Sequence, residues 1–282
     1  MKNKLYITIF FLMAVVLNLL VLSPFGLVRS GARYFLQGWG DYRPSHLLYI
    51  IFLVFFALYY ESDFMVERNG RTEKLFLLFI LVLMILSRTA YGPELHVFII
   101  TLSMFCLIKK ALWDFVFLAT AELCYALPSI YRIYRYGSFD QILLEEKREI
   151  ISKAYMWGHS GVTNRQNPYC GLPMRVLEEM GWIPLILLTA AFMLFIVFTF
   201  KTTKRAPDNQ KSNICLMIGI QQAVEVTYAL TEIIHPLPVA LLPYIEYPLA
   251  MRLTYLFELV IILQVHLQNR IRKKHRNKFK EE

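Results

Sequence analysis

Eight blocks of apolar residues recur along the chain, and polar stretches separate them. A helix needs roughly 20 apolar residues to cross about 30 Å of hydrocarbon. The first block and the last three blocks approach that length, whereas the second to fourth blocks are shorter. The pattern therefore predicts eight transmembrane helices, at 5–28, 46–60, 75–87, 95–108, 111–128, 182–200, 214–234 and 247–267.

Two features between the blocks predict how the helices connect. Lys109 and Lys110 interrupt what would otherwise be one long apolar run, which predicts a tight turn at the membrane surface. The stretch 131–181 is the one long polar loop, and long loops in compact folds are usually functional or disordered. It contains seven aromatic residues and an amphipathic run at 141–155, so we expect it to be ordered and to lie on the outer membrane surface. Gly158 and Gly161 predict a tight turn within it.

Composition narrows the class of protein. Of 282 residues, 57% are apolar or aromatic and only 18% are charged, which excludes an ordinary soluble domain and a disordered chain. No two of the four cysteines have metal-ligand spacing. We expect an all-α, polytopic integral membrane helix bundle, with a single transmembrane domain at 1–269 and a basic cytoplasmic tail at 270–282.

The distribution of positive charge predicts the orientation. Cytoplasmic loops carry an excess of Lys and Arg. Eight spans with both termini in the cytoplasm place the basic tail and most of the 30 Lys and Arg residues inside, whereas seven spans would place the tail outside. The first block lacks a small-x-small cleavage site at its end, so we expect a retained span rather than a signal peptide. The net charge of +9 thus indicates contact with membrane lipids and does not indicate nucleic acid.

Ionisable residues within spans suggest function by default, although pairing that holds a bundle together is the alternative. Arg252 could pair with Glu225 or Glu232, whereas Glu122 has no obvious partner in the sequence. Glu94 and Glu246 follow or precede prolines at predicted outer span ends, where a carboxylate can meet a polar headgroup. The other candidates are His96, His235 and Glu258.

A second acidic pair, Glu178 and Glu179, precedes the sixth span, where acidic residues would suit the positive end of a helix. No nucleophile elbow, P-loop or H-E-x-x-H motif occurs in the chain.

Seven short motifs follow one another in a familiar order. They are GARYFL at 31–36, RPSH at 43–46, GPELH at 92–96, YRIYR at 131–135, IISKAYMWGHSGV at 150–162, LEEMGWI at 177–183 and LPYIEY at 242–247. In this order the chain resembles the SEDS family (shape, elongation, division and sporulation), the RodA/FtsW polytopic glycosyltransferases of bacterial cell-wall synthesis. The resemblance covers roughly residues 5–270 and implies that eight of the family's ten spans are present.

The departures from the family concern its chemistry. The family's catalytic aspartate falls on Cys170, and no aspartate occurs between Asp140 and Asp208. The resemblance implies transfer of a lipid-linked sugar, which needs a carboxylate general base and cations for the leaving diphosphate. The carboxylates that could substitute as the base are Glu178, Glu179 and Glu94. The residues that could bind the substrate are Arg132, Arg135, Lys153, Arg165, Arg175 and Glu246.

The sequence leaves several functions open. We expect a SEDS-like protein of cell-wall synthesis, cell shape or division in the bacterial cytoplasmic membrane, degenerate at the catalytic aspartate and acting as a scaffold, with a single-pass transpeptidase as one candidate partner. The alternative is an active polymerase that uses lipid II or another undecaprenyl-linked sugar. A transporter or flippase would suit the carboxylates within spans, but no internal repeat supports it, and O-antigen polymerases and ligases are close neighbours. We expect no resident metal or cofactor, and a divalent cation only together with a diphosphate substrate.

Overall fold

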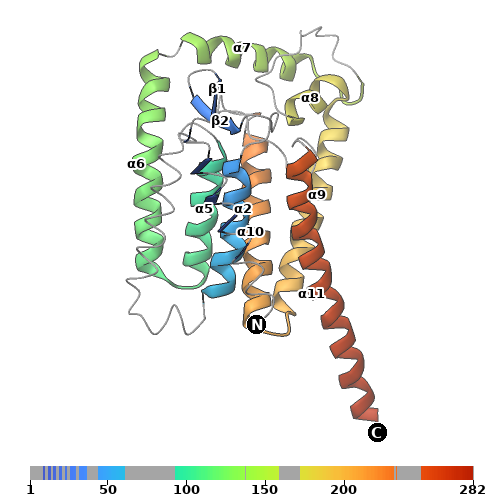
Figure 1. The fold of residues 1–282 in the computed structure, drawn as a ribbon. Helices are drawn as coiled ribbons and strands as arrows, with labels where there is room; N and C mark the ends of the chain where they lie inside the picture. The colour runs from blue at the N-terminus through green and yellow to red at the C-terminus, as the bar shows by residue number, and fades with distance from the viewer. Residues whose placement is uncertain are drawn as a thin grey trace. The chain divides into compact units, whose positions relative to one another are not determined.

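The structure is a computed structural model of residues 1–282. It describes scattered residues between 9 and 23, residue 233, and the ranges 26–29, 32–36, 44–60, 93–136, 138–158, 172–231 and 249–281. Within these ranges the chain is helical apart from one small sheet and short connecting segments (Figure 1). The helices are α2 Pro44–Tyr59, α5 Pro93–Ile108, α6 Leu112–Tyr136, α7 Ser138–Lys153, α8 Leu172–Glu179, α9 Trp182–Lys204, α10 Asn209–Thr231 and α11 Leu249–Glu281.

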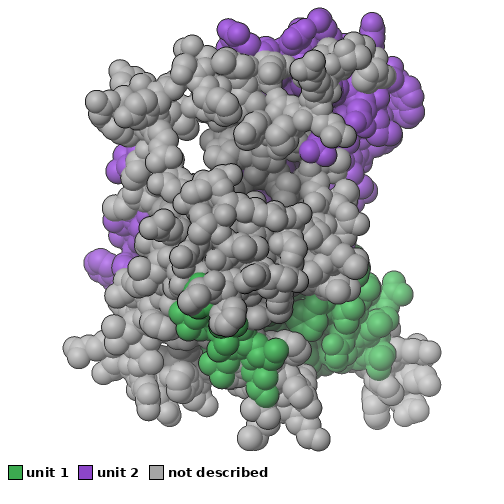
Figure 2. Space-filling model, turned by 45° about the horizontal axis from the view of Figure 1, so that its top comes forward, with its two compact units in different colours: residues 1–90, 197–220, 248–282 green, residues 91–196, 221–247 purple. Residues whose placement is uncertain are grey.

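Two compact units make up the chain, coloured separately in Figure 2. Unit 1 comprises 1–90, 197–220 and 248–282, and unit 2 comprises 91–196 and 221–247.

In unit 2, α5 and α6 form an antiparallel pair joined by a three-residue turn (Figure 1). The N–H of Lys110 donates to the carbonyl of Leu107 at 3.0 Å, and the N–H of Ala111 donates to that of Cys106 at 2.9 Å. This bond pattern is a Schellman motif, in which the residue after the helix adopts the left-handed conformation. Lys110 does so with φ of 60°, although glycine is usual there. The predicted turn at Lys109 and Lys110 is confirmed.

Helix α6 continues past the predicted end of its span. It passes through Pro128 and ends at Tyr136, so the expectations that the helix stops at 128 and that the loop begins at 131 are wrong. A proline removes one backbone hydrogen bond but need not end a helix that its neighbours support. At the ideal rise of 1.5 Å per residue, the 25 residues of α6 extend about 37 Å.

The predicted loop contains two further helices, α7 and α8, which contact one another and which we call the α7–α8 cap. Figure 1 shows α7 turning away from the axis of α6. Ile150 of α7 and Met174 of α8 are fully buried together, and Ile151 and Ile233 pack against them. The amphipathic run at 141–155 is therefore helical up to Lys153, and Ile150 and Ile151 on its apolar face are covered.

In unit 1, strands β1 Gly26–Arg29 and β2 Ala32–Leu36 pair antiparallel, and Gly26 lies opposite Leu36. The expectation that the first span continues to residue 28 is therefore wrong, because a strand begins at Gly26. Helix α2 begins at Pro44, where the missing N–H matters least, and it contacts β2 and α11. Helix α11 continues without a break across residue 270, so the predicted tail continues the last helix.

Two helices of the described ranges, α9 and α10, are long and apolar enough to cross a membrane, and 96–108 is a shorter apolar helix. The predicted sixth and seventh spans coincide with α9 and α10, and the eighth coincides with the first half of α11. The predicted span at 75–87 lies outside the described residues. The number of eight spans and the cytoplasmic location of both termini stay predictions.

Candidate functional site

The junction between α8 and α9 is held by main-chain hydrogen bonds from the segment that follows α7. The N–H groups of Trp182 and Ile183 donate to the carbonyls of Tyr155 and Met156 at 3.0 and 2.9 Å, and the N–H of Gly158 donates to the carbonyl of Met180 at 2.9 Å. The first N–H groups of a helix have no partner within the helix. Here the segment 155–158 supplies partners for two of them, so it ties the α7–α8 cap to the start of α9.

Gly181 makes this close approach possible. Its φ is +93°, and a Cβ built on it would lie 2.5 Å from the carbonyl oxygen of Tyr155. Residues other than glycine rarely adopt this backbone conformation, and a Cβ so close to the Tyr155 carbonyl would force the two main-chain segments apart. The predicted turn at Gly158 is also confirmed, with φ of +101°, but no atom of the described residues lies within 4 Å of its Cβ position. Gly161 lies outside the described residues.

The acidic pair Glu178–Glu179 occupies the last turn of α8. The expectation that it caps the sixth span is wrong, because α9 begins at Trp182 and has no acidic residue in its first turn. Glu179 is exposed and Glu178 is half-buried, while Arg175 is exposed one turn earlier on the same helix. The structure thus brings together one cation and two carboxylates among the predicted site residues.

The two lysines of α7 have different surroundings. Lys153 donates to Glu149 one turn earlier at 2.5 Å, and both side chains are about half exposed, so this is a surface ion pair of small energetic value. Lys147, in contrast, is 1% exposed. Lys147 was not among the predicted site residues, although its position three and four residues before Ile150 and Ile151 places it on the apolar face of the helix.

Other predicted site residues are placed only by their backbone. Glu94 is the second residue of α5, and Arg132 and Arg135 lie in the last turns of α6. Because α5 and α6 run antiparallel from a short turn, these three positions lie toward the same end of the helix pair. Arg165 and Glu246 lie outside the described residues, as does Cys170.

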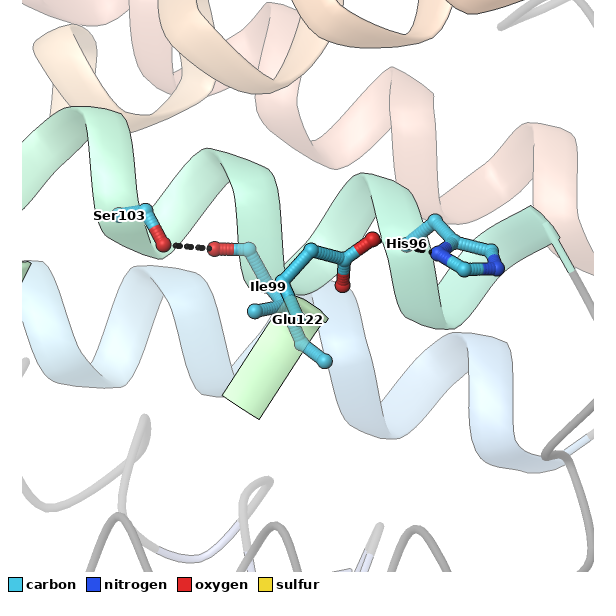
Figure 3. A network of polar contacts seen from close by, with 4 residues as sticks. All are labelled: His96, Ile99, Ser103 and Glu122. Atoms are coloured by element: carbon cyan, nitrogen blue, oxygen red, sulfur yellow. Dashed lines mark hydrogen bonds and ion pairs between the residues drawn. The ribbon is translucent and has the colours of Figure 1, made fainter. Parts of the chain in front are cut away.

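Within the α5–α6 pair, Nδ1 of His96 lies 2.5 Å from Oε1 of Glu122 (Figure 3). The two side chains are 16% and 18% exposed, and Oε2 of Glu122 has no hydrogen-bond partner among the described residues. Glu122 had no obvious partner in the sequence, and this expectation is wrong. Its partner is His96, 26 residues earlier on the neighbouring helix. This contact supports the structural interpretation of Glu122.

The structure describes some of the remaining carboxylates within the predicted spans. Gln221 donates to Oε1 of Glu225 at 3.1 Å, one turn along α10. Glu225 and Glu258 are both buried. The predicted pairing of Arg252 stays a prediction, because its side chain and those of Glu232 and His235 are not described. Among the described residues, no three His, Cys, Asp or Glu side chains are grouped to hold a metal ion.

Comparison with known structures relates this architecture to RodA. No protein-family model and no curated protein sequence matches the chain. The rod shape determining protein RodA of Thermus thermophilus is 16% identical with a TM-score of 0.67, and the match covers 95% of this chain and 80% of RodA. An aspartate-to-alanine mutant of the same RodA is 15% identical, with the same TM-score and coverage. A chain from a peptidoglycan synthase complex is 16% identical with a TM-score of 0.70, over 95% of this chain and 82% of that one.

These likenesses show the fold. The chain has the polytopic helical fold of RodA, and the resemblance predicted from the order of seven motifs is confirmed at that level.

Proposed function

We propose that this chain is a SEDS-like membrane protein of bacterial cell-wall synthesis that binds a partner or substrate without polymerising glycan. One observation carries the proposal: a chain with the RodA fold over 95% of its length has no aspartate between Asp140 and Asp208. In SEDS proteins, the catalytic aspartate belongs just before the E-E-L-G-like segment. That segment is LEEMGWI at 177–183 here.

The chemistry explains why the substitution matters. Attack of a sugar hydroxyl on an anomeric carbon needs a carboxylate within hydrogen-bond reach of the hydroxyl proton. Small displacements of such a base reduce rates severely, because alignment supplies a large part of the catalysis. Glu178 and Glu179 lie in the last turn of α8, after the position where the family's aspartate belongs. Glutamate at a different position is therefore a poor replacement.

An active polymerase is the second candidate, and the composition of α8 favours it. Arg175, Glu178 and Glu179 share one short helix that is joined firmly to the start of α9. In this alternative a carboxylate of α8, or Glu94, acts as the base. The substrate-binding residues would be Arg132, Arg135, Lys153, Arg165, Arg175 and Glu246. A divalent cation would arrive with the diphosphate as part of the substrate.

A reconstitution experiment separates the two candidates. The purified chain in lipid nanodiscs is incubated with fluorescent lipid II, and a second series uses other undecaprenyl-diphosphate sugars. We expect no polymer from wild type. Polymer formation that falls at least 100-fold in Glu178→Gln, Glu179→Gln or Glu94→Gln, but persists in Glu145→Gln, would establish the polymerase instead. Glu145 is the matched control, because it is an exposed glutamate of the same cap and is not among the proposed site residues.

A second experiment tests the scaffold role itself. The chain is crosslinked in native membranes and its partners are identified by mass spectrometry. We expect a wall-synthesis protein, with a single-pass transpeptidase as the leading candidate, and we expect loss of normal cell shape or division when the chain is depleted. Recovery of no wall-synthesis protein under conditions that capture a known membrane complex would contradict the scaffold role.

A further inference from the structure

Three consecutive large side chains project from the segment after α7. Tyr155, Met156 and Trp157 are 60%, 65% and 66% exposed, respectively. They lie outside the predicted spans, in a segment that connects polar helices. Exposed apolar side chains grouped in this way usually mark a binding surface.

The backbone beneath these side chains is fixed. The carbonyls of Tyr155 and Met156 accept hydrogen bonds from the first turn of α9, and the N–H of Gly158 is bound to Met180. Main-chain bonds therefore flank Trp157 on both sides. The side chains of residues 155–157 therefore project from a backbone that has a fixed position relative to the start of α9.

The position of α9 indicates what this projection meets. Helix α9 is 23 residues long with a mean hydropathy of 2.6 in its most apolar window, and only 17% of that window is buried. Its far end carries Lys201 and Lys204, which the distribution of positive charge assigns to the cytoplasmic side. Its first residues, and the segment bound to them, therefore lie at the opposite membrane–water boundary.

The side chains near this segment suit the hydrocarbon layer and the phosphate layer of that boundary. Along α9, Ile183, Ile186 and Leu187 are exposed and continue the apolar surface into the span. On α7, the exposed Arg148 can meet lipid phosphate, while the exposed Lys153 is paired with Glu149. Trp and Tyr are enriched at this level of membranes because their rings have an apolar body and a polar edge.

We propose that Tyr155, Met156 and Trp157 form an interface wedge that inserts between glycerophospholipids of the outer leaflet. The wedge sets the depth of the α7–α8 cap relative to the phosphate layer. The proposal concerns lipid contact alone, so it holds whether or not the chain polymerises glycan.

Difference fluorescence tests the wedge in the intact chain. Wild type and Trp157→Phe are reconstituted in nanodiscs of phosphatidylcholine with or without bromine near the top of one acyl chain, and also titrated with aqueous iodide. The chain has four tryptophans, so subtraction of the variant isolates the emission of Trp157. We expect the brominated lipid to quench that difference emission at least twofold and iodide to leave it nearly unchanged.

Two outcomes would overturn the proposal. Quenching by iodide but not by brominated lipid would place Trp157 in water, and quenching by neither would place it under protein, such as a second copy. Trp113→Phe serves as the matched control, because Trp113 is 80% exposed at the start of α6. An unchanged melting temperature of Trp157→Phe verifies that the variant is folded.

Discussion

The two ends of α9 are held by different kinds of bond. At its start, two N–H groups donate to main-chain carbonyls of Tyr155 and Met156. At its end, side-chain bonds add to the main-chain bonds of the turn into α10. Oδ1 of Asp208 accepts the N–H of Lys211 at 2.8 Å, and Oδ2 lies 3.0 Å from Nζ of the same lysine. Arg272 of α11 donates to the carbonyl of Pro207 at 3.0 Å.

The kind of bond determines whether pH, salt or backbone geometry affects each end of α9. Main-chain bonds carry no net charge, so pH and salt leave the start of α9 largely unaffected, whereas backbone geometry decides whether they form. The turn at Asp208 depends in part on charge. Partial burial would raise the pKa of this carboxyl, but hydrogen bonds from Lys211 and the positive charges of Lys211 and Arg272 outweigh burial and hold the pKa below its usual 3.8.

The largest expected effect comes from Gly181→Ala, which attacks the start of α9. The added Cβ would meet the carbonyl oxygen of Tyr155 at 2.5 Å in an unfavourable backbone conformation. We expect a loss of about 3 kcal/mol in unfolding free energy, from backbone strain and broken hydrogen bonds together. Denaturant unfolding in detergent measures it.

Gly158→Ala is the matched control for that variant. Gly158 has a similar φ of +101° but nothing within 4 Å of its Cβ position. We expect it to lose only about 1 kcal/mol, from strain alone. Equal losses in the two variants would show that the contact with Tyr155 contributes nothing.

A smaller effect is expected from the pair His96–Glu122, a side-chain bond away from both ends of α9. A double-mutant cycle with His96→Phe and Glu122→Gln should give a coupling energy of about 1 kcal/mol, typical of side-chain bonds between helices in membranes. Thermal unfolding of the four proteins measures the coupling. A coupling near zero would mean that the 2.5 Å contact adds no stability.

Asp208→Ala should lower the unfolding free energy by an amount similar to, or slightly smaller than, the coupling energy of the His96–Glu122 pair. It removes the side chain that accepts the Lys211 N–H at the start of α10, and loss of such a cap destabilises a helix by about 1 kcal/mol. Asp208→Asn keeps the cap and removes only the charge, so it should lose less than half as much. Equivalent losses would show that charge, not capping, holds this turn.

The smallest effect is the pH dependence of the same turn. A carboxyl whose pKa is lowered on folding stabilises the fold fully above its unfolded value of 3.8, and this contribution disappears as the pH falls through the folded value. The difference in stability between wild type and Asp208→Asn should therefore be constant from pH 5 to 7 and shrink below about pH 4. Gly181→Ala should show no such change in its difference from wild type.

Strong local patterns could be predicted from the sequence, whereas partners far apart could not. Two lysines within an apolar run identified the α5–α6 turn, and amphipathic spacing identified α7. Pro128 looked like a helix end, but α6 passes through it. The partner of Glu122 lies on another helix, which no local pattern reveals.

The site shows the same division. Spacing placed Glu178 and Glu179 near the start of α9, but the intervening Gly181 ends α8 and assigns them to the preceding helix. The carbonyls that cap α9 come from Tyr155 and Met156, more than 20 residues earlier, and main-chain carbonyls leave no signature in a sequence. The buried Lys147 was overlooked because its charge concealed its position on the apolar face.

Two different properties of Lys110 matter at the turn between α5 and α6, namely its left-handed backbone conformation and its positive charge. Glycine would fit its left-handed backbone with less strain, so a Lys110→Gly change would relax the turn between α5 and α6. In the topology predicted from the sequence, the same change would remove one of the two charges that assign this turn to the cytoplasmic side. In that topology, the slightly strained bend would also help to orient the helix pair before either helix has packed.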